Sequence, residues 1–200
     1  MDIDVKNIMA AYKTATESEK TLLSTLFPDL SLGQTDKAPD DRPVTERIKT
    51  FDDACCELGS DHPFVKSYLG YFENIHESNR NDNDVLAYQK LRIICAALNE
   101  GWEPQFTEDE WRWVPWLILW TESELVDKSD EWKADRHLIM IGDKYQSEYA
   151  GLAYAHSAAA PSSSNSYFGP RLCLKSEALA TYCGKQFIEL WAAFLLTPKK

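Results

Sequence analysis

The sequence predicts an α+β fold, in which N-terminal helices are followed by a small antiparallel sheet and then by a C-terminal amphipathic helix. Three observations carry this prediction. Apolar residues recur at the helical spacing of three and four positions as far as Asn99. Between Trp111 and Leu174 they alternate with other residues or form short β-branched runs, and the helical spacing returns after Ser176.

Residues 1–33 predict a helical hairpin that forms a separable arm. Thr16 and Glu19 have the spacing of a capping box and begin its second helix, which Pro28 ends. The first helix of the hairpin is indicated by apolar residues that share one face, namely Val5, Ile8, Met9 and Tyr12.

Residues 34–43 are polar and rich in turn-forming residues, which predicts a linker before a core domain of residues 44–200. The first clear helix of the core has Thr50 at its N-cap and Asp53 three positions later. Gly59 has the position of its C-terminal stop.

Two more helices are predicted before the sheet. Pro63 suits the first turn of one of them. Asp84 is expected to cap the other, over Val85–Asn99, and Gly101 to end it. The residues of this second helix that we expect to face the core are Leu86, Leu91, Ile94, Cys95 and Leu98.

The apolar period changes to two from Trp111, which indicates a strand. Trp111 and Trp113 alternate with other residues, and we count Leu117 and Leu119 as further positions of this strand. The other predicted strands are Leu138–Ile141, Tyr149–His156 and Phe168–Leu174, and a last helix begins at Ser176.

A tract rich in Ala, Ser, Pro and Asn separates the last two strands, and we expect residues 157–166 to form an exposed loop. Loops held by a rigid sheet are common binding surfaces. We therefore predict a ligand-binding surface made by the loop, its borders and nearby aromatic residues: Tyr154, His156, Ser157, Ser163, Asn165, Tyr167, Arg171, Trp111 and Trp113.

Two interpretations of Trp111 and Trp113, which flank Arg112, stay open. The pair could form a platform on which sugars or bases stack. The same alternation also fits strand residues that pack on the helices. Trp116 and Trp120, in the same segment, are expected in the core.

The composition excludes several classes of protein. The chain has 200 residues, of which 44% are hydrophobic and 12% aromatic, so it can build a sizeable core. Its formal net charge of −11 disfavours binding to nucleic acid or to anionic membranes. The longest apolar run, Val114–Trp120, is too short to cross a bilayer, and the N-terminus lacks the pattern of a signal peptide.

No motif predicts catalysis, a metal or a cofactor. The sequences HExxH, GxSxG, GxGxxG and the P-loop do not occur, and the five cysteines have neither zinc-site nor redox spacing. The acidic triplet of residues 108–110 is expected to face water. We therefore predict reduced thiols and a non-enzymatic protein without a cofactor.

Four blocks of the sequence resemble a large uncharacterised family from phages and prophages of gut bacteria. They are RIKTFDDACCELG (47–59), LRIICAALNEGWEPQF (91–106), WRWVPW (111–116) and GPRLCLKSEALATYCGKQFIELW (169–191). The resemblance implies a phage or mobile-element origin. It places synthesis in the bacterial cytoplasm, with the virion as an alternative final location.

The layout is also similar, more weakly, to the C-type-lectin-fold variable proteins of diversity-generating retroelements. Those proteins display Ser, Tyr, Asn, His and Ala side chains on a fixed scaffold. By this resemblance the displayed residues of the present chain would be Tyr154, His156, Ser157, Ser162, Ser163, Ser164, Asn165, Ser166 and Tyr167.

Three functions follow as hypotheses. The first is a phage protein, a virion component or receptor-binding accessory, that binds a glycan, protein or small molecule through the Ser/Ala loop. The second is an intracellular counter-defence protein that binds a nucleotide through Arg112, Arg171 and Lys175, although these cations could equally pair with the many acids. The third is a structural subunit, or a homo-oligomer, that assembles through its N-terminal helices.

Overall fold

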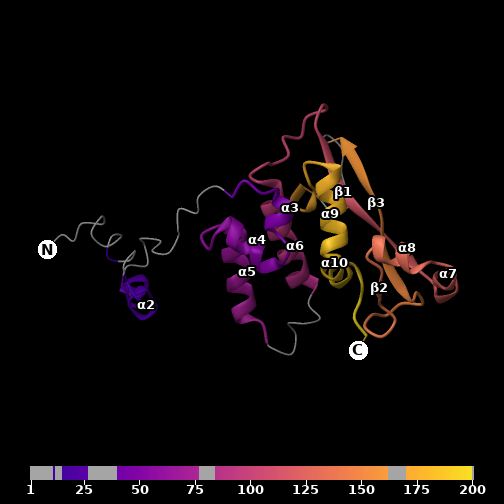
Figure 1. Ribbon diagram of the computed structural model, residues 1–200, viewed down its shortest axis with the longest axis horizontal. Coiled ribbons are helices and arrows are strands. Elements are labelled where there is room, and N and C mark those ends of the chain that lie inside the picture. The colour runs from indigo at the N-terminus through magenta and orange to yellow at the C-terminus, as the bar shows by residue number, and fades with distance from the viewer. Residues whose placement is uncertain (1–10, 12–14, 27–39, 77–83, 162–169, 200) are drawn as a thin grey trace. The chain divides into compact units, whose positions relative to one another are not determined.

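The computed structural model describes residues 11, 15–26, 40–76, 84–161 and 170–199 (Figure 1). The chain divides into two compact units, residues 1–41 and residues 42–200. In the first unit, α2 spans Glu17–Leu26. The backbone N and the hydroxyl of Thr16 both donate to Oε2 of Glu19 at 2.7 Å, so the predicted pairing at this helix start is confirmed. The predicted first helix lies outside the described residues except for Ala11, and so does most of the linker.

Four described helices open the second unit: α3 (Val44–Arg47), α4 (Phe51–Leu58), α5 (Pro63–Asn74) and α6 (Asp84–Asn99). The starts of α4, α5 and α6 and the end of α4 follow the predicted signals, whereas no helix was predicted at α3. Thr50 caps α4 by accepting from the backbone N of Asp53 at 3.1 Å, and the Asp53 carboxylate accepts from the backbone N of Thr50 at 2.8 Å. Gly59 ends α4 with a φ of 82°. His62 caps α5 by accepting from the backbone N of Phe64 at 3.2 Å.

Helix α6 is the centre of the helical part. All five of its residues that were predicted to face the core are buried, and so are Ile93 and Ala97, because α4, α5 and α10 pack around it. Its last residue, Asn99, is buried and donates from Nδ2 to the carbonyl of Cys173 at 2.9 Å. Oδ1 of the same side chain accepts from the backbone N of Lys175 at 3.0 Å. This amide therefore ties the end of α6 to the segment that precedes the last helices.

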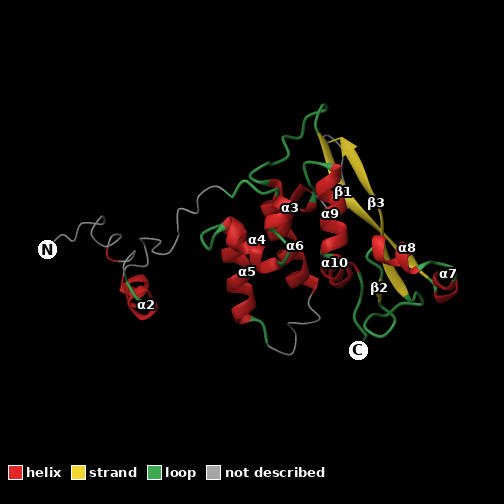
Figure 2. Cartoon of the chain, viewed as in Figure 1, coloured by secondary structure: helices red, strands yellow, loops and turns green. Residues whose placement is uncertain are grey.

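The sheet is antiparallel and has the strand order β1–β3–β2 (Figure 2). Strand β1 spans Trp111–Trp120, β2 spans Ile139–Met140 and β3 spans Gly151–Pro161. The register of β1 and β3 shifts at Trp116/Leu117, where β3 contributes one residue more than β1. Because of this bulge, Tyr154 and His156, which would otherwise share a face of β3, lie on opposite faces. The α+β class predicted from the sequence is confirmed.

The prediction of a strand at Phe168–Leu174 is wrong. Pro170–Leu172 form a 3₁₀ helix, and Leu174 makes an isolated bridge to Trp113. The backbone N of Trp113 donates to the carbonyl of Leu174 at 3.0 Å, and the reverse bond is 2.8 Å long. This segment therefore meets β1, whereas the segment before the Ser/Ala tract lies on the other side of β1 as β3.

The predicted exposed loop of residues 157–166 is also wrong in its first half. Residues 157–161 belong to β3 and pair with residues 111–115 of β1, while residues 162–166 lie outside the described residues. The composition misleads here because backbone hydrogen bonds to β1 need no large side chain. The small residues instead face large ones across the ribbon, as in the pairs Trp113–Ala159 and Arg112–Ala160.

The C-terminal part holds two helices where the sequence predicted one. Helices α9 (Glu177–Gln186) and α10 (Ile188–Leu195) meet at Phe187, whose φ of −114° and ψ of 29° interrupt the helix. Ser176 caps α9, as predicted, by accepting from the backbone N of Leu179. Both helices lie between α6 and the sheet (Figure 1), and the fully buried Trp191 of α10 lies in the core that they share with α6.

Candidate functional site

The two faces of the β1–β3 ribbon have different surroundings. On the inner face, Leu117 and Leu152 lie against the core residues Ile188 and Ala192 of α10. Because side chains alternate along a strand, the outer face carries the residues between these positions. They are Val114, Trp116 and Ile118 of β1, His156 and Ala158 of β3, and Met140 of β2, whose register partner is Gly151. We call these six residues the open sheet face.

Tyr154 and Ser157, two predicted ligand-binding residues, lie on the inner face. The hydroxyl of Tyr154 is 2.8 Å from the Thr181 hydroxyl of α9 and 3.0 Å from the Ser157 hydroxyl. The Ser157 and Thr181 hydroxyls are 3.1 Å apart, which closes a ring of three hydrogen-bonded groups. Tyr154 is buried against Gly184, so the expectation that its side chain is displayed is corrected: it joins β3 to α9.

The open sheet face centres on Trp116 and His156, which are register partners. Their rings are stacked, with centroids 6.0 Å apart and an interplanar angle of 21°. Trp116 is 40% exposed and Ile118 is 39% exposed, so the expectation that Trp116 belongs to the core is wrong. Its neighbours Pro115 and Leu117 point inward instead. His156, which was predicted as an exposed binding residue, is exposed.

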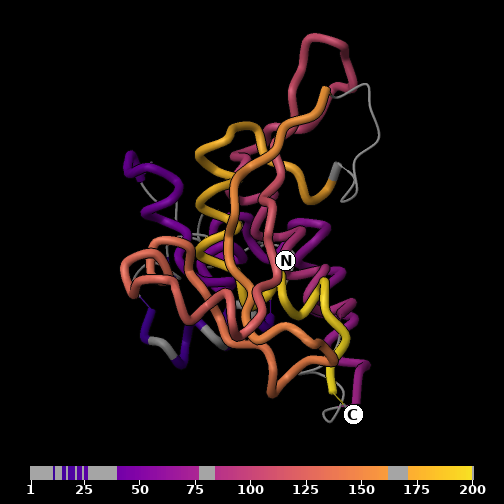
Figure 3. Tube along the Cα trace, turned by 90° about the vertical axis from the view of Figure 1, so that its right-hand side faces the viewer, coloured from indigo at the N-terminus to yellow at the C-terminus, as the bar shows by residue number. Residues whose placement is uncertain are grey.

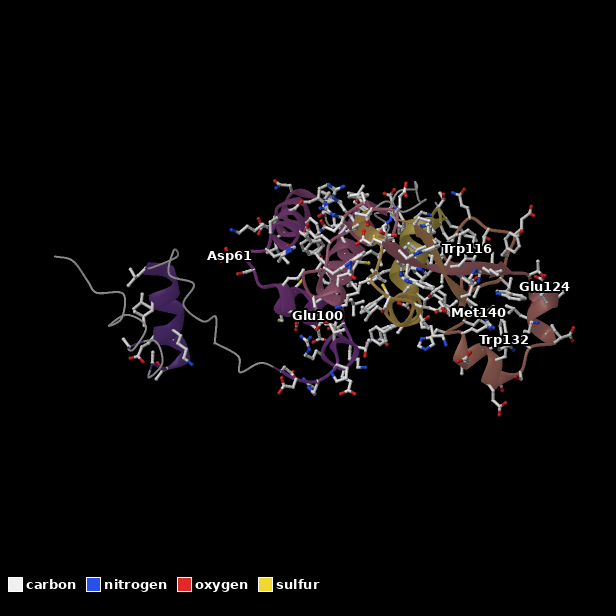
Figure 4. All side chains as sticks on the ribbon, turned by 90° about the horizontal axis from the view of Figure 1, so that it is seen from above. Asp61, Glu100, Trp116, Glu124, Trp132 and Met140 are labelled. Carbon is white, nitrogen blue, oxygen red and sulfur yellow. The ribbon has the colours of Figure 1, made fainter. Side chains whose placement is uncertain are left out.

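Helices α7 (Glu122–Val126) and α8 (Asp130–Asp135) bound one end of this face. Trp132 of α8 packs edge-on against Trp120, with ring centroids 5.0 Å apart. Gly151 lies beneath this end, and a Cβ added there would be 2.9 Å from Cδ1 of Leu125. Figure 4 shows Trp132 and Met140 beside each other, with Glu124 farther out on α7. Above Gly151 this end of the face is therefore covered by the protein itself, while Met140 beside it is 66% exposed.

Arg136 fixes α8 to the free edge of β3. Its Nη1 donates to the carbonyl of Ala155 at 2.7 Å and to the carbonyl of Tyr154 at 3.2 Å. The backbone N of Tyr154 donates in return to the carbonyl of Arg136 at 2.9 Å. These bonds fall where β3 has its additional residue, so the bulge has partners for its backbone groups.

The other end of the face is bounded by the loop before β1. Phe106, which is 56% exposed, lies over the guanidinium of Arg112, 5.7 Å from its ring centroid. Arg112 is itself buried. Figure 3 views β1 and β3 from the side opposite α9 and shows the two strands running in front of that helix. Among the described residues, no helix crosses the part of the ribbon that carries Trp116.

The other predicted site residues do not form one cluster. Trp113 packs against the core and forms a β-bridge with Leu174. Of its two interpretations, a stacking platform or a packed strand residue, the structure supports the packed residue. Trp111 is 53% exposed at the start of β1, and Arg171 is exposed in the 3₁₀ helix. The remaining three, Ser163, Asn165 and Tyr167, lie outside the described residues.

Two of the three basic residues that the nucleotide hypothesis requires, Lys175 and Arg112, already contact other side chains of the protein. Lys175 is 2.9 Å from Oε2 of Glu100, and Arg112 is buried beneath Phe106. Arg47 contacts Glu57 and is 2.6 Å from the other oxygen of Glu100. The hydrogen bond from Lys175, together with the charges of Lys175 and Arg47, holds the pKa of Glu100 below its ordinary value.

Three of the five cysteines have a thiol pKa above the ordinary value. Burial raises the pKa of Cys55 and of Cys173 to about 11. The hydrogen bond between the thiols of Cys95 and Cys183, together with burial, raises the pKa of Cys95 well above its ordinary value. Across residues 11, 15–26, 40–76, 84–161 and 170–199, no group of three or more His, Cys, Asp or Glu residues is placed to hold a metal ion.

Comparison of the chain with known protein families, with curated proteins and with solved structures found no match. None of the helices in the described part of the chain is both long enough and apolar enough to cross a membrane. The open sheet face is thus the feature on which a function can be argued.

Proposed function

We propose that this chain is a non-enzymatic protein, encoded by a phage or prophage, that binds a protein partner through the open sheet face. The phage origin rests on the resemblance of the four sequence blocks described above. The single observation that supports binding is the apolar character of β1 on both of its faces. A virion component or receptor-binding accessory would use such a surface.

An antiparallel sheet with one face in water normally alternates apolar and polar residues. Strand β1, WRWVPWLILW, breaks this rule because Arg112 is its one charged or polar residue. Arg112 has an outward position but is buried beneath Phe106, and the next outward positions carry Val114, Trp116 and Ile118 where a solvated face would carry polar side chains. A strand that is apolar on both faces is typical of a sheet that is covered on both sides.

The kinds of residue on the open sheet face favour a protein as its ligand. Trp and Met are enriched at protein interfaces, and a few such residues usually carry most of the binding energy. Met140 is 66% exposed and lies on the same face as the stacked pair of Trp116 and His156. Glycan sites combine aromatic rings with several polar side chains, whereas His156 is the one polar residue among the six that define this face.

The proposal is tested by photo-crosslinking in cells that express the full-length chain. A photoreactive amino acid replaces Ile118 on the open sheet face, and in a matched variant it replaces Leu69, a 44% exposed residue of α5. We expect a discrete adduct at position 118 that is missing at position 69, and the adduct is then identified by mass spectrometry. Equal adducts at both positions, or none at position 118 under conditions of phage induction, would contradict the proposal.

A further inference from the structure

We infer that the partner of the open sheet face is an amphipathic helix whose apolar side is flanked at both ends by basic residues. This inference rests on the proposed function and adds the shape and charge of the ligand. The open sheet face is long and narrow, because its residues follow one strand and that strand's immediate neighbours.

The dimensions of the face suit a helix. Between its two borders, Arg112 beneath Phe106 and Trp120 against Trp132, the strand has nine residues and so eight intervals, which is roughly 27 Å at about 3.4 Å per interval. A helix of about 18 residues has this length at 1.5 Å per residue. The inner face of the same ribbon is already covered by α9 (Figure 1), and a helix on each face of a sheet is a standard layered arrangement.

Acidic side chains border both ends of the strip. In the loop before β1, Glu103, Glu108 and Asp109 are exposed; in and around α7 and α8, Glu122, Glu124, Asp127, Asp130 and Glu131 are exposed. Hydrogen bonds from the backbone N and hydroxyl of Thr121 lower the pKa of Glu124 below its ordinary value, so this carboxyl stays ionised at neutral pH.

Three basic residues at these ends, Lys128, Arg136 and Arg112, make internal contacts. Lys128 lies over the rings of Trp120 and Trp132, at 5.0 and 5.2 Å from their centroids. Arg136 donates to strand carbonyls, and Arg112 is buried beneath Phe106. Lys133 of α8 adds one positive charge against the five exposed acids in and around α7 and α8, so the outward charge at both ends is negative.

Complementary charge then specifies the partner. A ligand with an apolar middle and cationic ends matches an apolar strip between two acidic borders, and such matching sets specificity and the rate of association. A second copy of this chain would bring a formal net charge of −11 against the same acidic borders, which disfavours self-association through this face.

The inference is tested with two synthetic helical peptides of about 18 residues, the length that matches the strip. Both have the same leucine face, and one carries Lys where the other carries Glu at its ends. Binding of each labelled peptide to the full-length protein is measured by fluorescence anisotropy. We expect the Lys peptide to bind at least about tenfold more tightly than the Glu peptide near 0.15 M salt, with a smaller ratio at 1 M salt because of screening.

Variants of the protein locate the effect. Replacing one acid at each end, Glu108→Lys with Glu131→Lys, is expected to weaken the Lys peptide by about tenfold, the scale of roughly 1.4 kcal/mol. The matched pair Glu46→Lys with Glu73→Lys makes the same change in net charge on α3 and α5 and is expected to leave binding unchanged. Ile118→Asp is expected to abolish binding of the Lys peptide.

Four other results would each contradict a different part of the inference. Equal affinity of the two peptides, with both lost in Ile118→Asp, would leave the open sheet face as a binding surface and remove the charge argument. Equal weakening by both pairs of lysine substitutions would show that net charge alone attracts the peptide. Binding that survives Ile118→Asp would place the peptide on another surface. If neither peptide binds, a helical ligand is rejected. In that case the crosslinking at position 118 still tests the proposed function.

Discussion

The indole of Trp116 lies stacked on the imidazole of His156, its register partner, on the face of the sheet opposite α9. The pair is exposed, whereas the fully buried Trp191 lies in the core beside α6. Two tryptophans of one small domain thus differ in what surrounds them. That difference separates a side chain that is partly exposed on the sheet from one that is enclosed by the core.

Replacing each of these tryptophans by alanine is expected to have different effects on stability. Trp116→Ala removes a cross-strand pair and should lower the free energy of unfolding by about 1 kcal/mol. Trp191→Ala empties a fully buried site and should cost about 3–5 kcal/mol. Urea denaturation followed by circular dichroism measures both, and a loss for Trp116→Ala as large as that for Trp191→Ala would place Trp116 among the residues that hold the core.

Two helical glycines provide a matched test of the packing of α9 on the sheet. A Cβ added at Gly184 would lie 2.5 Å from the Cβ of Pro115 and 3.0 Å from Cδ2 of Tyr154, whereas one added at Gly70 would meet nothing within 4 Å. Both alanine variants gain helix propensity of about 1 kcal/mol. We expect Gly70→Ala to stabilise the protein by up to that amount and Gly184→Ala to destabilise it by about 1–3 kcal/mol.

Thermal denaturation of the two variants gives the comparison directly. A rise in the Tm of Gly184→Ala similar to that of Gly70→Ala would mean that α9 does not approach β1 as closely as Pro115 and Tyr154 require.

The hydroxyl of Tyr154 is expected to contribute to stability and not to binding. Tyr154→Phe removes two of the three hydrogen bonds of its cluster and leaves the bond of 3.1 Å between Ser157 and Thr181. Because one hydrogen bond typically contributes about 1 kcal/mol net, we expect a loss of roughly 1–2 kcal/mol in the free energy of unfolding. Affinity for the partner captured at position 118 should be unchanged, and a clear loss of affinity would return Tyr154 to the binding surface.

Acid should weaken the contacts that join α6 to the segment after the 3₁₀ helix. The pKa of Glu100 is lowered in the folded protein by Lys175 and then by Arg47, relative to an ordinary value of 4.5. A group whose pKa is lowered by folding contributes stability above its unfolded pKa and loses that contribution as the pH falls through its folded pKa. The contribution of Glu100 is therefore present near neutral pH, begins to decline near pH 4.5 and is lost as the pH falls through the lower pKa of the folded state.

Chemical denaturation of the wild type and of Glu100→Gln, from pH 7 to pH 3, measures this contribution. The two free energies of unfolding are expected to differ at pH 7 and to converge at the acidic end. A difference that stays constant across the whole range would show that the Glu100 carboxylate gains nothing from Lys175 and Arg47.

Local signals in the sequence determined the helical half of the fold well. The cap at Thr50, the place of Pro63 in the first turn of α5 and the buried face of α6 could be predicted because each depends on residues within one or two turns of a helix. The second half depends on contacts between distant segments. Residues 157–161 form a strand because β1 supplies their hydrogen-bond partners, and their own composition carries no sign of it.

The candidate site could be predicted only in part, for a reason that lies in strand geometry. A shift of one residue moves a side chain to the other face of a sheet. The bulge at Trp116/Leu117 makes such a shift, so Tyr154 and Ser157 both face α9 while His156, between them, faces outward. His156 was found from its position beside the Ser/Ala tract. Trp116 was missed, although the absence of polar residues from VPWLILW, residues 114–120, was the signal that could have indicated two covered faces.

The most direct measurement is the affinity of the partner captured at position 118 for the wild type, for Trp116→Ala and for Leu69→Ala, determined by isothermal titration calorimetry with proteins shown to be folded. We expect Trp116→Ala to weaken binding by at least about 30-fold, which corresponds to the roughly 2 kcal/mol typical of a central interface residue, and Leu69→Ala to change it less than about twofold. Unchanged affinity in Trp116→Ala would contradict the central claim that this protein binds its partner through the open sheet face.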